Sequence, residues 1–271
     1  MPTCRLPDGT RVAAANRLEC RFLYQEIFVD RIYQLDGIAP GGCIVDVGAN
    51  IGLFGLWASR HLEPARMLNF EPIPETFASL EANAAHHFPA AERSNAGLAR
   101  ESGTATFRYY PRAAGWASMG TREDLLRESL FAYLQRGSLG LPLAAFQLLG
   151  KVAPRVQRAI HDRVCNRIFA GGQDLQCPVF SLSDVIDGHH IDRIDLLKLD
   201  VEGAELEILQ GVNSEHWPRI GAITAEVEDV SDRLEAVASL LLGRGFRVDE
   251  RQSRELDNTP FHMLTARRVS A

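Results

Sequence analysis

The segment Asp46-Val47-Gly48-Ala49-Asn50-Ile51-Gly52 combines a carboxylate with two glycines in a short stretch. Gly48 and Gly52 allow the backbone to turn sharply and to approach a ligand closely. A loop that binds a pyrophosphate has the spacing G-x-G-x-x-G, which this segment lacks, and the Asp46 carboxylate would repel a pyrophosphate. The same carboxylate can face the ammonium group of an amino acid. The segment therefore favours S-adenosylmethionine over NAD as the ligand.

A second acid follows at a distance that suits the same ligand. Glu71 ends an apolar run about 25 residues after Asp46. In Rossmann-like sites, an acid at this place accepts hydrogen bonds from the hydroxyl groups of a ribose. Asp46 and Glu71 are therefore predicted to bind two different parts of one nucleoside cofactor.

The segment Lys198-Leu199-Asp200-Val201-Glu202-Gly203-Ala204-Glu205 brings three further acids together. Asp200 and Glu202 are predicted to lie at the carboxyl end of a buried strand, where open α/β sheets bind their ligands. Acids this close can bind a cation or act as bases. Glu205 is expected to lie in the next helix and to interact with the positive end of that helix.

Apolar runs and helical patterns alternate along most of the chain. Short β-branched runs predict strands, and apolar residues at three- and four-residue spacing predict helices. Strands that alternate with helices form a parallel sheet covered on both faces. Only residues 254–260 join the last two strands, too few for a helical crossover, so these strands should pair antiparallel. The predicted strands lie within 43–52, 66–72, 91–97, 104–110, 194–203, 221–229, 246–252 and 261–268, and the predicted helices within 17–35, 53–63, 74–87, 204–212 and 233–245.

Residues 1–271 are expected to form a single domain, in which residues 1–40 are an N-terminal helical segment. Residues 116–176 do not fit the alternation and are expected to form a helical insertion that covers the active site as a lid. His161 is the histidine best placed to face the pocket from this lid. One part of the insertion is basic, and it can either dock an acidic carrier protein or form a solvated helix face. Its basic residues are Lys151, Arg155, Arg158, Arg163 and Arg167.

The composition limits the classes of partner. A formal net charge of −6 argues against nucleic-acid binding, which needs a basic face. The five cysteines are scattered without a C-x-x-C pair, as expected for reduced thiols in a cytosolic protein. No apolar run approaches the roughly 20 residues of a membrane span. We therefore expect a cytoplasmic protein that binds neither nucleic acid nor membrane.

The sequence resembles the FkbM-type methyltransferases. This family is similar to O-methyltransferases of polyketide, macrolide and glycan pathways. The resemblance implies a Rossmann-like class I methyltransferase fold, an α/β fold with a mostly parallel seven-stranded sheet and one antiparallel strand. The matching segments are FLYQEIFVDRIYQLDGI, IVDVGANIGLFGLWASR, NFEPIPETFASLEANA, IDLLKLDVEGAELEILQGV and ITAEVED.

The resemblance also implies roles for particular residues. Ala96 and Gly97 would lie near the adenine of the cofactor, Tyr24 over its methionine end, and Ser118 next to it. Where the family is expected to show E-V-H-D, this chain has Glu226-Val227-Glu228-Asp229. Glu228 then replaces that histidine as the base, or the base lies elsewhere. The predicted cofactor site comprises Tyr24, Asp46, Gly48, Asn50, Gly52, Glu71, Ala96, Gly97, Ser118 and Glu202.

Methyl transfer to an alcohol needs a base, or a metal ion that lowers the pKa of the hydroxyl group. Asp200 and Glu226 end neighbouring predicted strands and can flank an acceptor hydroxyl. The two carboxylates can instead bind Mg²⁺, which prefers oxygen ligands. A metal-free base is the favoured interpretation, and the candidate catalytic residues are Asp200, Glu226 and Glu228.

The acceptor is less defined than the cofactor. The apolar lid favours a hydroxyl group on a polyketide-like or other secondary metabolite, either free or bound to an acyl carrier protein. A sugar or glycan hydroxyl is the alternative. An NAD-dependent oxidoreductase is disfavoured by the spacing of the loop, and a non-catalytic nucleoside-binding module is disfavoured by the intact acids at Asp46, Glu71 and Asp200.

Overall fold

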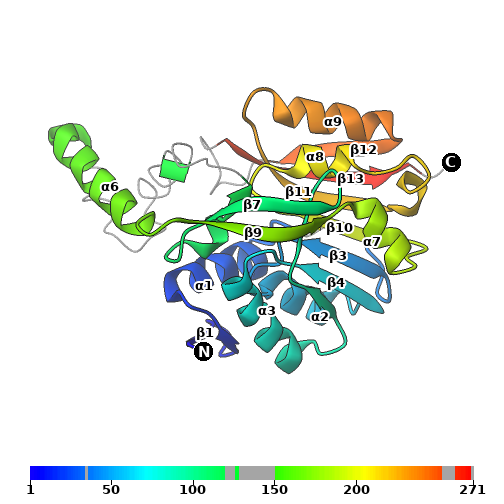
Figure 1. Cartoon of the computed structure of the whole chain (residues 1–271), viewed down its shortest axis with the longest axis horizontal. Helices are drawn as coiled ribbons and strands as arrows, with labels where there is room; N and C mark the ends of the chain where they lie inside the picture. The colour runs from blue at the N-terminus through cyan, green and yellow to red at the C-terminus, as the bar shows by residue number, and fades with distance from the viewer. Residues whose placement is uncertain (34–35, 120–125, 128–149, 252–259, 270–271) are drawn as a thin grey trace.

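The computed structural model describes residues 1–33, 36–119, 126–127, 150–251 and 260–269 (Figure 1). Its main sheet has seven strands in the order β12-β13-β11-β10-β3-β4-β5. β13 runs antiparallel to both of its neighbours, and the other pairs are parallel. The strands are β3 (Cys43–Val47), β4 (Arg66–Phe70), β5 (Glu92–Ser94), β10 (Leu196–Leu199), β11 (Ala222–Glu228), β12 (Phe246–Arg251) and β13 (Phe261–Arg268).

This strand order confirms the predicted class I methyltransferase fold. The chain runs outward in one direction from β3 to β5 and in the other direction from β10, so the order reverses between β3 and β10. Open α/β sheets bind their ligands beyond the carboxyl ends of the strands at this reversal. The glycine loop (residues 48–52) follows β3, and Asp200 follows β10, so both lie at that place.

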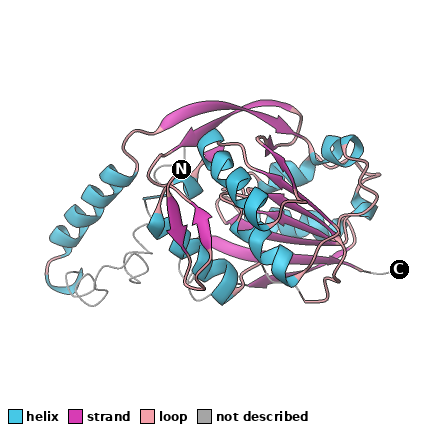
Figure 2. Cartoon of the chain, turned by 90° about the horizontal axis from the view of Figure 1, so that it is seen from below, coloured by secondary structure: helices cyan, strands magenta, loops and turns pink. Residues whose placement is uncertain are grey.

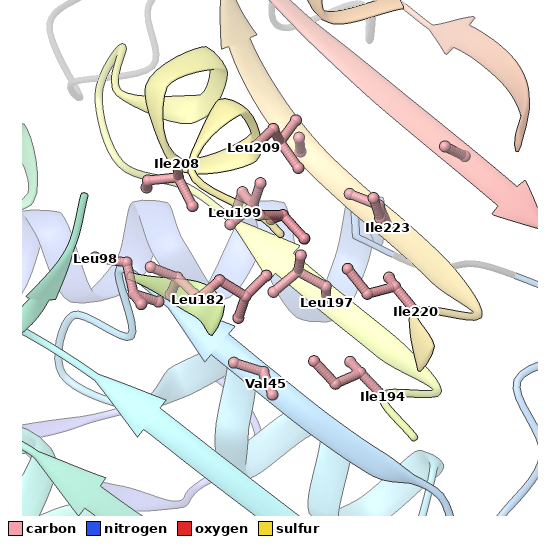
Figure 3. Packing of buried hydrophobic residues seen from close by; sticks show 14 of the residues in the cluster. Val45, Leu98, Leu182, Ile194, Leu197, Leu199, Ile208, Leu209, Ile220 and Ile223 are labelled. Atoms are coloured by element: carbon pink, nitrogen blue, oxygen red, sulfur yellow. The ribbon is translucent and has the colours of Figure 1, made fainter. Parts of the chain in front are cut away.

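Helices cover both faces of the sheet because the central strands are apolar on both sides. Ile44 packs with α2 and α3, whereas Val45 and Val47 pack with α7 and α8 on the opposite face. Figure 3 shows Leu199 of β10 beside Ile208 and Leu209 of α8, and Val45 of β3 near Leu182 of α7. The helices on the first face are α1 (Arg17–Tyr24), the π-helical turn η1 (Gln25–Asp30), α2 (Leu53–His61) and α3 (Pro74–His87), and those on the second are α7 (Leu182–Gly188), α8 (Glu205–Gln210), the 3₁₀ turn η3 (Trp217–Arg219) and α9 (Arg233–Gly243).

The predicted helix over residues 17–35 is shorter in the structure, and a hairpin precedes it. Helical structure ends at Asp30, and Arg31 adopts a left-handed backbone conformation with φ of 53°. The hairpin of β1 (Thr3–Arg5) and β2 (Arg11–Ala13) lies within the segment that was expected to be only helical. Its strands have three residues each, too few for a periodic pattern to reveal them.

A second sheet lies beside the main one and has the strand order β6-β9-β7-β8. β9 begins at Gln173, inside the range that was predicted to be a helical insertion, and pairs antiparallel with β7. Within that range α6 (Pro154–Ile168) is helical, and residues 120–125 and 128–149 lie outside the described part of the chain. The strands are β6 (Gly97–Leu98), β7 (Gly103–Tyr109), β8 (Ser118–Met119) and β9 (Gln173–Phe180), and the 3₁₀ turn η2 (Ala114–Trp116) precedes β8.

The helix α6 projects from the body of the protein at the end of β7 and β9 (Figure 1). Figure 2 shows the same helix at the left, separated from the other helices. Its last turn is anchored, because Arg112 donates a hydrogen bond to the carbonyl oxygen of Arg167 and Tyr110 packs edge-on against Phe169. Among the described residues, no helix is both long enough and apolar enough to cross a membrane.

Candidate active site

A pocket with about 560 Å³ of open space lies at the carboxyl ends of β3, β4 and β10. Part of this space is open to solvent. Six of the residues predicted from the sequence line it together. They are Gly48, Asn50, Glu71, Gly97, Asp200 and Glu202.

The backbone of the glycine loop packs directly against the strand end that carries Asp200. Gly48 has φ of 75°, and a Cβ atom at this position would lie 1.8 Å from the backbone oxygen of Asp200. The Gly48 and Ala49 N–H groups both donate to the carbonyl oxygen of Phe70, at 3.0 and 2.9 Å. Gly48 is therefore required for close approach between two segments of the protein as well as for the turn.

The Glu71 carboxylate lies on the pocket wall and is fixed by two backbone N–H groups. Asn50 donates to its Oε2 atom at 3.0 Å, and Ile73 donates to its Oε1 atom at 2.9 Å. Burial raises the pKa of Glu71 to about 7, although the two hydrogen bonds oppose the rise. Each oxygen keeps a lone pair, so this carboxylate can accept further hydrogen bonds from the hydroxyl groups of a ligand.

The outer wall of the pocket comes from the second sheet and the turn η2. Gly97 and Phe107 lie at one end, and a Cβ atom at Gly97 would come within 2.9 Å of the Phe107 ring. Gly115 of η2 donates its N–H to the Glu19 carboxylate of α1 at 2.5 Å. Glu19 thus holds this wall to the first helix, and burial raises the pKa of Glu19.

Asp46 does not line the pocket, which corrects the expectation that its carboxylate faces a ligand. Asp46 is fully buried behind the glycine loop, and its Oδ1 atom lies 3.1 Å from the ammonium nitrogen of Lys198. The side chain points away because β3 alternates its residues between two covered faces. The ammonium group that Asp46 faces belongs to the protein itself.

Acidic side chains gather on the side of the pocket formed by β10 and β11. Burial raises the pKa of Glu226 to about 8, and the nearby charge of Asp200 adds to the rise. Burial likewise raises the pKa of Glu202 well above its usual range, with Asp200 again contributing. Both glutamates therefore bind protons more readily than a solvated carboxylate does. Perturbed acids of this kind are typical of catalytic sites.

Glu228 lies near this group but outside the pocket. It is buried, and its Oε2 atom lies 3.6 Å from the guanidinium group of Arg233. The structure thus puts Glu226, rather than Glu228, nearer to Asp200, because Tyr33 bridges those two acids.

Four other predicted residues do not line the pocket. The ring of Tyr24 stacks on Phe28 with centroids 4.8 Å apart, and Asp8 and Arg60 are its charged neighbours. Tyr24 therefore lies on the outer side of α1, which corrects its expected place over the cofactor. Gly52 begins α2, where a Cβ atom would meet Leu80 at 2.7 Å. Ala96 and Ser118 are buried beside lining residues.

His161 does not reach the pocket from α6. Its Nε2 atom lies 2.9 Å from the carbonyl oxygen of Arg127 and 3.1 Å from the sulfur atom of Cys165. The imidazole is therefore part of the packing under α6. The expectation that His161 faces the active site is wrong.

Three residues of the site were missed by the sequence analysis: Tyr33, Lys198 and Glu19. Lys198 belonged to a recognised motif, and a lysine inside an apolar strand signals a buried partner, because lysine is almost never buried unpaired. Tyr33 and Glu19 carry no local signal. Their partners are distant in sequence, as with Tyr33 and Asp200, which are 2.8 Å apart.

Glu205→Gln is expected to stabilise the protein at alkaline pH. Glu205 is fully buried, one of its oxygens has no partner, and burial raises its pKa to about 7. Because the folded-state pKa is raised, the contribution of Glu205 to stability is complete below pH 4.5 and is lost as the pH rises through 7. The neutral amide of glutamine does not ionise and keeps this contribution at every pH. The free energy of unfolding of the variant should therefore exceed that of the unmodified protein by about 2–3 kcal/mol at pH 8 and by little at pH 5.

Urea unfolding at both pH values measures this difference. Glu207→Gln is the matched control, because Glu207 is exposed on the same helix and its replacement should change stability by less than about 0.5 kcal/mol. An equal effect of Glu205→Gln at pH 5 and pH 8 would contradict the prediction.

Comparison with known proteins relates this geometry to one family. The family described as Methyltransferase FkbM domain matches residues 46–248. The chain is 37% identical to the 31-O-demethyl-FK506 methyltransferase FkbM of Streptomyces tacrolimicus, with 99% of this chain and 97% of that protein covered. It is 34% identical to the AMB antimetabolite synthetase AmbE of Pseudomonas aeruginosa, over 94% of this chain but 12% of that protein.

Among solved structures, the methyltransferase FkbM from Methylobacillus flagellatus KT matches with 15% identity and a TM-score of 0.48. The match covers 93% of this chain and 51% of that chain. The family match spans most of the chain, and the 37% identity to the Streptomyces protein extends over nearly all of it. This chain therefore belongs to the FkbM family of S-adenosylmethionine-dependent methyltransferases.

Proposed function

We propose that this protein transfers a methyl group from S-adenosylmethionine to a hydroxyl group of a polyketide-like secondary metabolite. The observation that carries the proposal is a pocket with a fixed carboxylate, Glu71, at one end and the acids Asp200 and Glu202 at the other. The relative named 31-O-demethyl-FK506 methyltransferase supports a hydroxyl group as the acceptor and a secondary metabolite as the molecule that bears it.

The residues of the pocket fit the cofactor. Gly48 lets the glycine loop pack against the backbone of Asp200, so that both residues line the same pocket. Glu71 is held by two N–H groups and has lone pairs left for the ribose hydroxyls. Gly97, Leu98 and Phe107 form an apolar end suited to the adenine. When bound, the cofactor supplies a methyl group already activated on a sulfonium.

The side chains of this protein would then align the acceptor, exclude water and take up its proton. Asp200 and Glu226 are the two candidates for the base, since Tyr33 holds both of them beside the pocket. A hydroxyl group is a poor nucleophile at neutral pH, so the base is the part of the chemistry that the cofactor does not supply. Ala117 and Met119, at the start of the 116–176 insertion, line the outer wall and support its role as a lid.

A metal-free base is favoured over Mg²⁺ because Asp200 already has a cation beside it. The ammonium nitrogen of Lys198 lies 3.3 Å from the Asp200 Oδ2 atom. A divalent ion bound to the same oxygen would be repelled by this buried positive charge. EDTA should therefore leave methyl transfer unchanged, and restoration of activity by added Mg²⁺ would contradict this choice.

The acceptor is proposed to arrive on an acidic carrier protein that docks on α6. Arg155, Arg158 and Arg163 are exposed along α6, and the apolar side chain of Val156 is exposed in its first turn. This basic surface stands out on a chain whose net charge is −6, so it complements an acidic partner. The relative AmbE, in which the matching region is a small part of a synthetase, agrees with a tethered acceptor.

Charge reversal tests the carrier proposal. Arg155→Glu/Arg158→Glu should raise the KM for a carrier-bound acceptor by about tenfold and leave the KM for the same acceptor free in solution unchanged. The matched control is Asp162→Asn, because Asp162 is exposed on the same helix with the opposite charge. If the double variant has the same KM for both forms of the acceptor as the unmodified protein, α6 is not the docking surface.

Ligand binding and mass gain test the methyltransferase proposal itself. S-adenosylhomocysteine should raise the melting temperature and NAD should not, because only a ligand that binds the native state stabilises it. Hydroxylated polyketides, their carrier-bound forms and glycans are then incubated with S-adenosylmethionine and screened for a mass gain of one methyl group. Methylation of the glycans alone would show that the acceptor is a glycan and not a polyketide. An unchanged melting temperature with S-adenosylhomocysteine would overturn the methyltransferase proposal.

A further inference from the structure

The ammonium group of Lys198 joins the glycine loop to the acids of the site. Lys198 belongs to β10 and is only 2% exposed. Its Nζ atom lies 2.7 Å from the carbonyl oxygen of Gly48, 3.1 Å from Asp46 Oδ1 and 3.3 Å from Asp200 Oδ2. The ammonium group therefore donates a hydrogen bond to the Gly48 carbonyl oxygen and forms ion pairs with the Asp46 and Asp200 carboxylates.

Lys198 is therefore a fixed charge. Burial lowers the pKa of Lys198, but the Asp46 and Asp200 carboxylates outweigh burial and leave the pKa raised. The ring of Tyr33 lies 5.2 Å from the Nζ atom and adds a cation–π contact. The ammonium group therefore stays charged, and its hydrogen bond and two ion pairs hold it in place between the glycine loop and the acids.

Tyr33 distinguishes the two candidate bases. Its hydroxyl oxygen lies 2.8 Å from Asp200 Oδ2 and 3.4 Å from Glu226 Oε2. The hydroxyl group donates to both oxygens, and the shorter and stronger of the two hydrogen bonds is to Asp200. Burial and the neighbouring Asp200 charge raise the pKa of Tyr33 well above its usual range, so the phenol remains a donor.

The two acids consequently have unequal environments. Asp200 Oδ2 contacts both the Lys198 ammonium and the Tyr33 hydroxyl, and these two contacts hold the Asp200 carboxyl group in place. Among the described residues, Glu226 receives only the longer contact from Tyr33, which leaves lone pairs available for an acceptor hydroxyl group. Glu226 is also partly exposed, which lets an acceptor outside the cofactor pocket reach it.

We infer that Lys198 and Tyr33 are positioning residues that give the two acids different roles. They hold the Asp200 carboxyl group in place, and Glu226 acts as the base. The inference rests on the proposed function. The acceptor O–H bond breaks, and its proton passes to a Glu226 oxygen. The electron pair of the acceptor oxygen forms the new C–O bond, and the electron pair of the broken C–S bond stays on sulfur, which becomes neutral.

The pH dependence of the site follows from the groups that face Glu226. Asp200, Glu202 and Glu205 oppose its ionisation, and Lys198 and Tyr33 favour it. The pKa of Glu226 is raised to about 8, near the working range of a general base. Turnover should therefore rise with pH through this value.

The first experiment compares Glu226→Gln with Asp200→Asn. Glu226→Gln should lower kcat by at least about 100-fold. It should change the affinity for S-adenosylhomocysteine by less than about twofold, because Glu226 does not line the pocket. Asp200→Asn should weaken binding as well, because Asp200 does line it. Glu235→Gln, an exposed acid on α9, is the control and should match the unmodified protein.

Turnover that survives Glu226→Gln and disappears in Asp200→Asn would invert the assignment and overturn the inference. Failure of the wider proposal gives a different result, because the unmodified protein would then bind no S-adenosylhomocysteine. The two failures are therefore distinguishable in one set of measurements.

The second experiment needs no acceptor. The Glu226 carboxyl signal is followed by ¹³C NMR in protein labelled at glutamate and saturated with S-adenosylhomocysteine, and is assigned by its absence in Glu226→Gln. Its midpoint should lie near pH 8 and should move to higher pH in Tyr33→Phe, because the Tyr33 hydrogen bond favours the carboxylate. Affinity for S-adenosylhomocysteine should stay within about twofold. An unchanged midpoint would overturn the role of Tyr33.

The third experiment tests Lys198. Lys198→Met leaves the buried Asp46 carboxylate and the half-buried Asp200 carboxylate without a cation, so the double variant Lys198→Met/Asp46→Asn is made alongside it to preserve folding. The double variant should bind S-adenosylhomocysteine at least about tenfold more weakly, because the Gly48 carbonyl oxygen loses its donor, and should also lose kcat. A folded double variant with unchanged affinity and unchanged kcat would refute the positioning role.

Discussion

Gly48→Ala is expected to cost about 3–5 kcal/mol of unfolding free energy and to abolish measurable binding of S-adenosylhomocysteine. The methyl group of the alanine would lie 1.8 Å from the backbone oxygen of Asp200, and backbone atoms cannot yield as a flexible side chain does. The residue also has φ of 75°, a conformation that side chains disfavour. Urea unfolding and calorimetric titration measure the two effects.

The matched control for this prediction is Gly243→Ala. Gly243 ends α9 and adopts no left-handed conformation, and a Cβ atom at this position would have no neighbour within 4 Å. Alanine is the better helix former, so this control should be as stable as the unmodified protein or slightly more stable. Equal stability of Gly48→Ala and Gly243→Ala would contradict the close approach of the glycine loop to β10.

Glu71→Ala is expected to weaken S-adenosylhomocysteine binding by about 10- to 150-fold. Hydrogen bonds to a charged group contribute about 1.5–3 kcal/mol each, and this carboxylate faces the pocket with lone pairs to spare. The substitution also removes the acceptor for the Asn50 and Ile73 N–H groups, so the loop itself loses a support. Isothermal titration calorimetry at pH 8, above the raised pKa of Glu71, gives the affinity.

Glu75→Ala provides the comparison. Glu75 is an exposed acid in the first turn of α3, one turn beyond Glu71, and does not line the cofactor pocket. Its removal should leave the affinity unchanged within about twofold. If both variants bind as the unmodified protein does, the assignment of Glu71 to the ribose is wrong.

The main sheet was predictable because each of its strands and the following helix can be recognised from the pattern of neighbouring residues. Each strand–helix unit from β3 to α3 has its own apolar pattern, and the predicted range 74–87 coincides with α3. The antiparallel pairing of β12 with β13 followed from their short connection. The second sheet was not predictable, because β7 and β9 pair across the whole insertion and β9 carries polar residues such as Gln173 and Asp174.

The same distinction between local and distant contacts decided which site residues were predictable. Motif spacing located Gly48, Glu71 and Asp200, because sheet topology brings the ends of β3, β4 and β10 together. It misjudged Asp46, since the cation that pairs with it comes from Lys198 on another strand. The tyrosine expected at the site was Tyr24, but the tyrosine beside the acids is Tyr33. Tyr33 follows the end of the helical segment at Asp30, so the helical pattern did not point to it.

The one-sided attachment of α6 has a consequence for how such proteins diversify. The last turn of α6 is tied to Tyr110 and Arg112, while the first turn exposes Pro154, Arg155 and Val156. Exchange of these outer side chains alters no contact of the pocket-lining residues. With carrier docking on α6, as proposed, a few substitutions at these positions would change which carrier protein is accepted and would leave the reaction chemistry unchanged.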